Sequence, residues 1–180
     1  MRKFILFLLL LAGTVWYTNA QHLKVKHAFY AEALGNAKNF SINYERRLYN
    51  STQVYVFLRT GVSPGKYKYV TNAYFAPKFP TELSIAFRTY YEHMMEWGIG
   101  ATPYLSQERT LNPNGTSTAS GQYEWNHYYA LCFGYRYQPT EKGVMFRIAI
   151  TPLFAGSEDD TYIENKIEAM YYGVSLGYSF

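Results

Sequence analysis

The chain has 180 residues, of which 19% are aromatic, and a formal net charge of +4 at pH 7. This length suits one domain, and no repeat, linker or low-complexity segment divides it. Such a nearly balanced charge lacks the concentrated basic face of nucleic-acid-binding proteins, so we expect no nucleic-acid partner. Cys132 is the only cysteine, which excludes an intramolecular disulfide and a cysteine-based metal cluster. We expect no cofactor and no metal site.

The first 20 residues have the form of a cleavable signal peptide. Arg2 and Lys3 precede an apolar run from Phe4 to about Ala12, and the small residues of 18–20 offer a cleavage site. The run is too short for a membrane-spanning helix, and no later segment is apolar for long enough. We therefore expect a signal peptide at 1–20 and one domain at 21–180. Cleavage removes two basic residues and lowers the net charge from +4 to +2.

The segment 168–180 alternates strictly between large apolar and small residues. Its large residues are Met170, Tyr172, Val174, Leu176, Tyr178 and Phe180. Because successive side chains of a strand point to opposite faces, one face is aromatic and the other is nearly bare. This pattern predicts a strand of a transmembrane β-barrel, with its apolar face toward lipid. The segment also resembles the C-terminal signal that the barrel-assembly machinery recognises, which would consist of Tyr172, Val174, Leu176, Tyr178 and Phe180.

Alternating segments recur along the whole chain. We count eight: 27–34, 40–49, 53–62, 81–91, 94–104, 122–137, 144–154 and 168–180. The second, fourth and sixth connections are short, the first is a turn at 35–39, and the other three are long loops at 63–80, 106–121 and 155–167. With a periplasmic N-terminus, the short connections fall in the periplasm and the long ones outside. The sequence thus predicts an all-β, eight-stranded antiparallel transmembrane β-barrel, integral to the outer membrane.

Charged residues occupy the face expected to line the lumen. The predicted lumen charge network is Glu32, Glu45, Arg47, Arg59, Arg88, Glu96, Arg136 and Arg147, with Glu124 as a further candidate. Side chains nearly fill the interior of an eight-stranded barrel, and charges buried there must pair. We expect a salt-bridged plug. The alternative is a narrow, charge-lined channel or transporter.

Several motifs resemble those of a known family. They are 43–48 (Asn-Tyr-Glu-Arg-Arg-Leu), 96–100 (Glu-Trp-Gly-Ile-Gly), 134–139 (Gly-Tyr-Arg-Tyr-Gln-Pro), Phe-Arg at 146–147 with Thr-Pro-Leu-Phe at 151–154, and the terminal Gly-Tyr-Ser-Phe. Together they resemble a family of small, mostly uncharacterised outer-membrane β-barrel proteins of the Bacteroidota, similar to OmpA- or OmpX-like barrels. The resemblance implies a fold and a membrane but brings no known reaction.

A lipid A acyl hydrolase or transferase is a further alternative, as in PagP- and PagL-like barrels. Acyl chemistry requires a nucleophile beside a base, and only His127 lies near an external loop, with Glu124, Ser117 and Ser120 as companions. By strand parity His127 points outward and Glu124 inward. A histidine at a membrane interface is ordinarily a polar tip among the headgroups, so we expect no catalytic residue and no enzyme.

Two groups of loop charges complete the candidates. Glu158, Asp159, Asp160 and Glu164 could bind a divalent cation that bridges surface lipids, but their spacing matches no known ion-binding loop. Lys66, Lys68 and Lys78 could meet lipopolysaccharide phosphates, although basic surface loops are common. We expect a monomer with a structural or surface-interaction role, in contact with outer-membrane lipid and lipopolysaccharide.

Overall fold

The computed structural model describes residues 23–69, 72–111, 117–155 and 169–180. The expected signal peptide at 1–20 lies outside these residues, as does nearly all of the expected loop at 155–167. Within the described ranges, no helix is long and apolar enough to cross a membrane.

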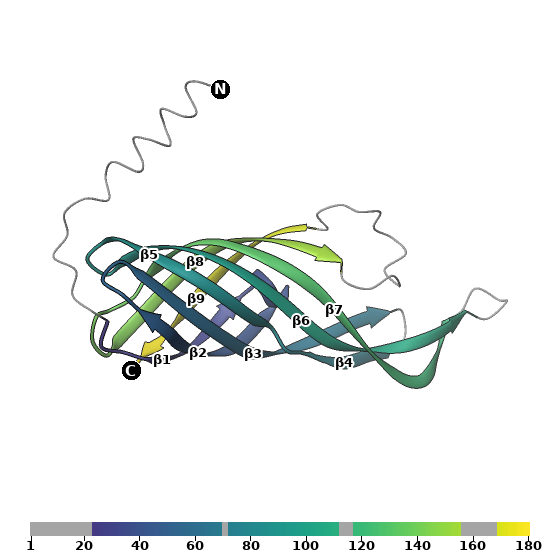
Figure 1. The fold of residues 1–180 in the computed structure, drawn as a ribbon. Coiled ribbons are helices and arrows are strands. Elements are labelled where there is room, and N and C mark those ends of the chain that lie inside the picture. The colour runs from purple at the N-terminus through teal and green to yellow at the C-terminus, as the bar shows by residue number, and fades with distance from the viewer. Residues whose placement is uncertain (1–22, 70–71, 112–116, 156–168) are drawn as a thin grey trace, which may run out of the picture.

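The described chain forms one antiparallel sheet that closes on itself (Figure 1). Its elements are β1 (His27–Ala33), the 3₁₀ helix η1 (Gly35–Ala37), β2 (Phe40–Asn50), β3 (Val54–Tyr69), β4 (Asn72–Lys78), β5 (Thr81–Tyr90), β6 (His93–Leu111), β7 (Ser117–Tyr137), β8 (Gly143–Ala155) and β9 (Ala169–Ser179). β9 pairs with β1 and completes the ring. β4 and β5 both pair with β3 and follow one path around the wall, interrupted only at residues 79–80. The barrel therefore has eight strand positions, which confirms the predicted fold class.

The two ends of the barrel differ in their connections (Figure 1). At one end lie the short connections 51–53, 91–92 and 138–142, together with the start of β1 and the end of β9. We call this the turn end. At the other end lie η1, the β3–β4 hairpin and the long β6–β7 hairpin, and we call it the hairpin end. The two hairpins project beyond the ring of paired strands.

The hairpins correct two predicted loops. The chain at 63–80 is the upper part of β3 and the whole of β4, and 106–121 is largely the paired ends of β6 and β7. Prolines and glycines suggested loops there, but Pro64 lies opposite Pro77 in the β3–β4 ladder. A strand near a sheet edge tolerates proline because the missing N–H costs no central ladder bond.

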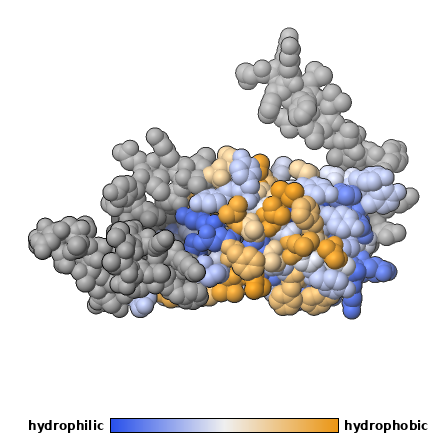
Figure 2. All heavy atoms as spheres, turned by 180° about the vertical axis from the view of Figure 1, so that it is seen from behind, coloured by the Kyte–Doolittle hydropathy of each residue, from blue (hydrophilic) through white to orange (hydrophobic). Residues whose placement is uncertain are grey.

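The alternation of side chains follows the predicted parity. Large apolar residues point outward around the barrel and form an apolar belt, whose members include Ile42, Leu58, Ile85, Ile99, Phe133 and Leu176. Figure 2 shows such residues gathered over the middle of the barrel, with more hydrophilic residues toward the turn end. Tyr172, Val174, Leu176 and Tyr178 of β9 and Phe180, which follows it, all face outward, as predicted.

The seam between β1 and β9 depends on a glycine. A Cβ atom added at Gly177 would lie 2.2 Å from the carbonyl oxygen of Phe29 and 2.2 Å from Cβ of Tyr30. Because both are fixed parts of the neighbouring strand, no larger residue fits without moving β1. The small inward face of β9 therefore lets the seam close and leaves room in the lumen for side chains from other strands.

Candidate functional site: the charged lumen

Seven charged side chains meet in the middle of the lumen, and we call them the lumen network. They are Glu32 of β1, Glu45 of β2, Arg59 of β3, Glu82 of β5, Glu96 of β6, Arg136 of β7 and Arg147 of β8. All are buried, and each comes from a different strand. Their charges therefore hold most of the barrel wall together from the inside.

One part of the network joins Arg59 and Arg147 through two shared carboxylates. Arg59 donates hydrogen bonds to Glu32 at 3.0 Å and to Glu82 at 2.6 Å. Arg147 donates to the second oxygen of each, at 3.3 Å for Glu32 and 2.6 Å for Glu82. It also donates to Sγ of Cys132 at 2.8 Å. Each carboxylate thus lies between two guanidinium groups.

The other part is centred on Arg136. Its guanidinium makes two hydrogen bonds to Glu45, at 2.5 and 2.7 Å, and two to Glu96, both at 3.0 Å. One face lies over the Phe57 ring, 4.3 Å from the ring centre. Glu96 also accepts a hydrogen bond from Arg147 at 2.9 Å, which connects the two parts. Paired guanidinium and carboxylate groups of this kind make the strongest hydrogen bonds in proteins.

Tyr30 closes the network into a ring. Its hydroxyl donates to Glu45 at 3.4 Å and accepts from Arg59 at 3.3 Å. Burying a charge is costly unless partners surround it, and here every carboxylate contacts at least one guanidinium. Removing one member would leave its partners buried without their full set of contacts.

The structure brings together most of the predicted lumen charges but not all. Glu32, Glu45, Arg59, Glu96, Arg136 and Arg147 lie in the lumen network. Arg47 is half-buried near the turn end and donates to the carbonyl of Leu23 at 2.6 Å. Arg88, also near the turn end, lies over the Tyr55 ring at 5.1 Å. Glu124 keeps its predicted parity, between the outward Tyr123 and Trp125, but it is exposed and lies outside the lumen network.

Glu82 is the network member that the prediction omitted. It lies on the same face of its strand as Ser84, Ala86 and Arg88, so parity alone could have identified it. The prediction that Arg47 belongs to the lumen network failed for a local reason. The register of β2 against β3 shifts between Arg47 and Tyr49, and such an irregularity ends the regular alternation.

An apolar cluster fills the lumen at the turn end, and we call it the turn-end seal. It consists of Leu23, Val25, Tyr55, Phe57, Ala86 and Met94. Leu23 precedes the first strand, yet its side chain is only 2% exposed. The backbone there is fixed by hydrogen bonds from Lys24 N to the carbonyl of Thr140, at 2.8 Å, and from Arg47 N to that of Lys26, at 2.8 Å.

An exposed ion pair accompanies this segment. Lys24 Nζ lies 2.7 Å from Glu141. Chiefly through this hydrogen bond, the pKa of Lys24 is raised and the pKa of Glu141 is lowered. Exposed pairs of this kind contribute little to stability because solvent screens them. The apolar contacts of Leu23 and Val25 and the backbone hydrogen bonds of the segment therefore hold it in place more than the ion pair does.

The helix η1 fills the lumen at the hairpin end. A turn was predicted at 35–39, and within it Gly35, Asn36 and Ala37 are all buried. The carbonyl of Asn36 accepts a hydrogen bond from the Tyr128 hydroxyl at 2.8 Å, and its side chain accepts one from Thr102 at 2.9 Å. Gly35 has φ of 63°, a conformation that glycine adopts without strain.

The candidates for other chemistry do not assemble into a site within the described residues. The His127 ring contacts the outward ring of Tyr129, with 5.2 Å between centroids. No described group of three or more His, Cys, Asp or Glu residues could hold a metal ion. The side chains of Ser117, Ser120, Lys66 and Lys68, and the acidic residues 158–160 and 164, lie outside the described part of the chain. The Lys78 side chain points inward, with Nζ 3.4 Å from the carbonyl of Ala37.

Comparisons with known proteins identify the fold. No family model and no curated protein sequence matches the chain. The crystal structure of the N-terminal β-barrel domain of Pseudomonas aeruginosa OprF is similar with a TM-score of 0.51 and 12% identity, over 89% of this chain and 100% of that one. Ail, the attachment invasion locus protein of Yersinia pestis, is similar with a TM-score of 0.44 and 12% identity, over 86% of this chain and 93% of that one. The chain therefore has the fold of an antiparallel outer-membrane β-barrel.

Proposed function

We propose that the chain is an integral outer-membrane β-barrel with a closed lumen, and that its role is structural or surface interaction. The turn end faces the periplasm and the hairpin end faces the exterior. The apolar belt supports the membrane placement, because apolar side chains facing outward around a closed sheet suit a lipid environment (Figure 2). The short connections at one end and the projecting hairpins at the other support the orientation.

The filling of the lumen carries the proposal for function. Three successive layers occupy it: the turn-end seal, the lumen network and η1 with the side chains around it. In a barrel of eight strands, side chains of this size nearly fill the interior. The lumen thus serves as the core of the protein. Interaction with other molecules falls to the outer surface and to the hairpins.

Conductance measurements test this proposal. The refolded protein is placed in a planar bilayer, and comparison of unheated and boiled samples on a gel establishes that it has folded. We expect no reproducible single-channel conductance from the folded protein. Reproducible conductance that changes when Arg136 or Glu96 is replaced by Gln would overturn the closed lumen and favour a narrow channel.

The C-terminal strand supports a further part of the proposal, namely assembly by the barrel-assembly machinery. Phe180 faces outward and its ring stacks on Phe29, 6.0 Å between centroids, where β9 meets β1. We expect Phe180→Ser to lower the amount of folded barrel in the outer membrane, measured by heat-modifiability on gels. Phe29→Ser, which removes the ring contact but keeps the last residue, is the control. Equal losses in both variants would mean that Phe180 acts through packing alone.

A further inference from the structure

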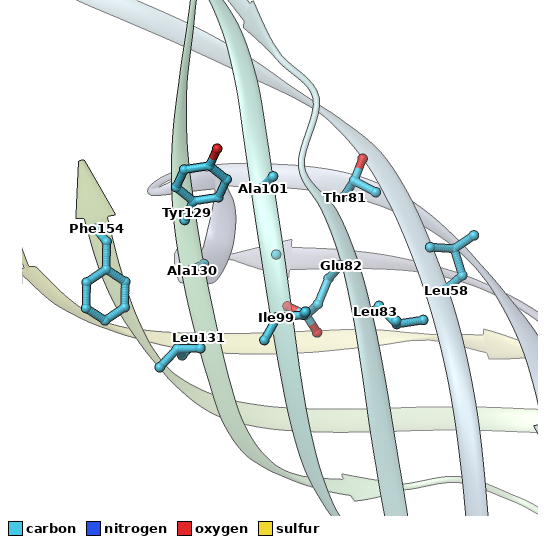
Figure 3. Close-up of a pocket in the computed structure, with 11 residues that line it drawn as sticks. Leu58, Thr81, Glu82, Leu83, Ile99, Ala101, Tyr129, Ala130, Leu131 and Phe154 are labelled. Atoms are coloured by element: carbon cyan, nitrogen blue, oxygen red, sulfur yellow. The ribbon is translucent and has the colours of Figure 1, made fainter. Parts of the chain in front are cut away.

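The outer face of the barrel carries a hollow of about 450 Å³ (Figure 3). It spans the outward faces of β5, β6 and β7, with Leu58 of β3 at one side and Phe154 of β8 at the other. We call it the outer hollow. Elsewhere along these strands the apolar belt is formed by large side chains, so the hollow interrupts an otherwise filled surface.

The register of the strands explains the hollow. Thr81, Ala101 and Tyr129 lie side by side on neighbouring strands, and the first two are small. One row nearer the turn end, Leu83, Ile99 and Leu131 lie side by side and are all large. The side chains of Leu83, Ile99 and Leu131 project outward and form a ledge. The small side chains of Thr81 and Ala101, on the hairpin side of this ledge, form the floor of the hollow. The rings of Tyr129 and Phe154, which are paired across β7 and β8, wall one side.

The polarity of the outer hollow changes along the barrel axis. Glu82, Gly100 and Ala130 border the hollow from the inward face of their strands, and the outward side chains that line it are aliphatic or aromatic except at two hydroxyl groups. In Figure 3 the hydroxyls of Thr81 and Tyr129 both point away from the ledge of Leu83, Ile99 and Leu131, toward the hairpin end. The wall is therefore purely apolar toward the middle of the barrel and becomes polar toward its outer rim.

We propose that the outer hollow seats one acyl chain of a lipid of the outer leaflet. This inference rests on the proposed membrane placement, because only there is the hollow covered by hydrocarbon. An acyl chain is apolar and narrow, and it fills a lipid-facing gap that a rigid protein surface leaves without contacts. The hydroxyls at the outer rim match the headgroup side of a lipid whose chain points toward the middle of the membrane.

Photo-crosslinking tests the proposal. The refolded protein is placed in phosphatidylcholine vesicles that contain a small fraction of phosphatidylcholine with a diazirine on one acyl chain, and crosslinked residues are mapped by mass spectrometry. We expect crosslinks to concentrate on the residues of the outer hollow, several-fold above other belt positions. Ala101→Phe fills the floor and should reduce them several-fold. Ala101→Leu is a milder filling variant if the first fails to fold.

Ala33→Phe is the matched control, since Ala33 is another outward alanine, on β1 and outside the outer hollow. It should leave crosslinking at the hollow unchanged. Crosslinks spread evenly over the belt would overturn the acyl-chain site while upholding the membrane placement. An absence of crosslinks anywhere on the belt would overturn the membrane placement itself. Crosslinks between two copies through the hollow would show that a second chain, not a lipid, occupies it.

Discussion

The middle of the lumen and its turn end are filled by opposite chemistry. The middle holds paired charges from seven strands, whereas the turn end holds apolar side chains, two of which precede the first strand. A charge in the lumen network is fixed to the barrel wall and shares its partners with its neighbours. Leu23 instead belongs to a segment that can detach without opening the ring of strands. We therefore expect substitutions in the lumen network to destabilise the whole barrel. Substitutions at the turn end should loosen only the segment that carries them.

The largest effect is expected from Arg136→Met. This change leaves Glu45 and Glu96 without their two-bond partner in the buried lumen. Breaking a buried ion pair by removing one side typically costs about 3–5 kcal/mol, and we expect a loss of this size in the free energy of unfolding. Denaturant titration of the folded barrel in detergent or lipid, followed on unheated gels, measures it.

Arg46→Met is the control for Arg136→Met, because Arg46 is an exposed arginine on β2. It should cost far less. Adding Glu45→Gln to Arg136→Met should recover part of the stability, since it removes one of the uncompensated charges. An unfolding midpoint for Arg136→Met equal to that of the wild type would mean that the lumen network contributes nothing to stability.

Leu23→Ala should have a smaller and local effect. Removing a buried leucine side chain costs about 2–5 kcal/mol, and we expect the lower end because the segment can relax away from the cluster. Trypsin should cut at Lys24 or Lys26 faster than in the wild type while the barrel remains folded on an unheated gel. Leu48→Ala, which shortens an exposed leucine, should not change that rate. A loss of global stability as large as that of Arg136→Met would contradict the contrast between the two regions.

Tyr128→Phe tests the hairpin end and should be milder still. It removes the hydrogen bond to the carbonyl of Asn36 but keeps the ring, over which Lys38 Nζ lies at 4.4 Å. Losing one hydrogen bond costs about 1 kcal/mol. We expect faster hydrogen exchange of the backbone amides at 34–39 and little change elsewhere. The outward neighbour variant Tyr129→Phe is the control, and equal exchange in both variants would contradict a specific role for Tyr128.

Some features of these regions could be predicted from the sequence, and others could not. Strand parity is local, so the outward belt and the inward charges follow from alternation, and even the omitted Glu82 obeys it. The position of an inward side chain along the barrel axis is harder to predict. Arg47 and Arg88 have the parity of network members but lie nearer the turn end, where the irregular register of β2 and the Tyr55 ring determine their contacts.

The two ends of the lumen could not be predicted from periodicity. Leu23 and η1 lie outside every alternating segment, and their contacts join residues far apart in the chain, such as Leu23 with Arg47 and Asn36 with Tyr128. The proline-containing hairpin at 63–80 escaped prediction for another reason. Proline disfavours central strands but not strands near a sheet edge, and a pattern of residues does not reveal which kind a strand is.

The smallest effect is expected from Glu92→Gln, on the turn that joins β5 to β6. Glu92 accepts hydrogen bonds from the Tyr137 hydroxyl at 2.7 Å and from the backbone N and hydroxyl of Thr140 at 2.9 and 3.0 Å. These donors, Tyr137 above all, hold the pKa of Glu92 below its ordinary value. A carboxylate with a lowered pKa stabilises the fold above its unfolded pKa, near 4.3, and this stabilisation is lost as the pH falls through the folded pKa.

The stability difference between wild type and Glu92→Gln should therefore be largest at neutral pH and shrink below about pH 4. It should stay under about 1 kcal/mol, because the side chain is only partly buried and solvent screens it. Denaturant midpoints across this pH range measure it, with the exposed Glu124→Gln as the control. A difference that is constant with pH would mean that the carboxylate charge is irrelevant. Unlike the charges of the lumen network, Glu92 would then hold two neighbouring turns together only through hydrogen bonds that the neutral amide can also accept.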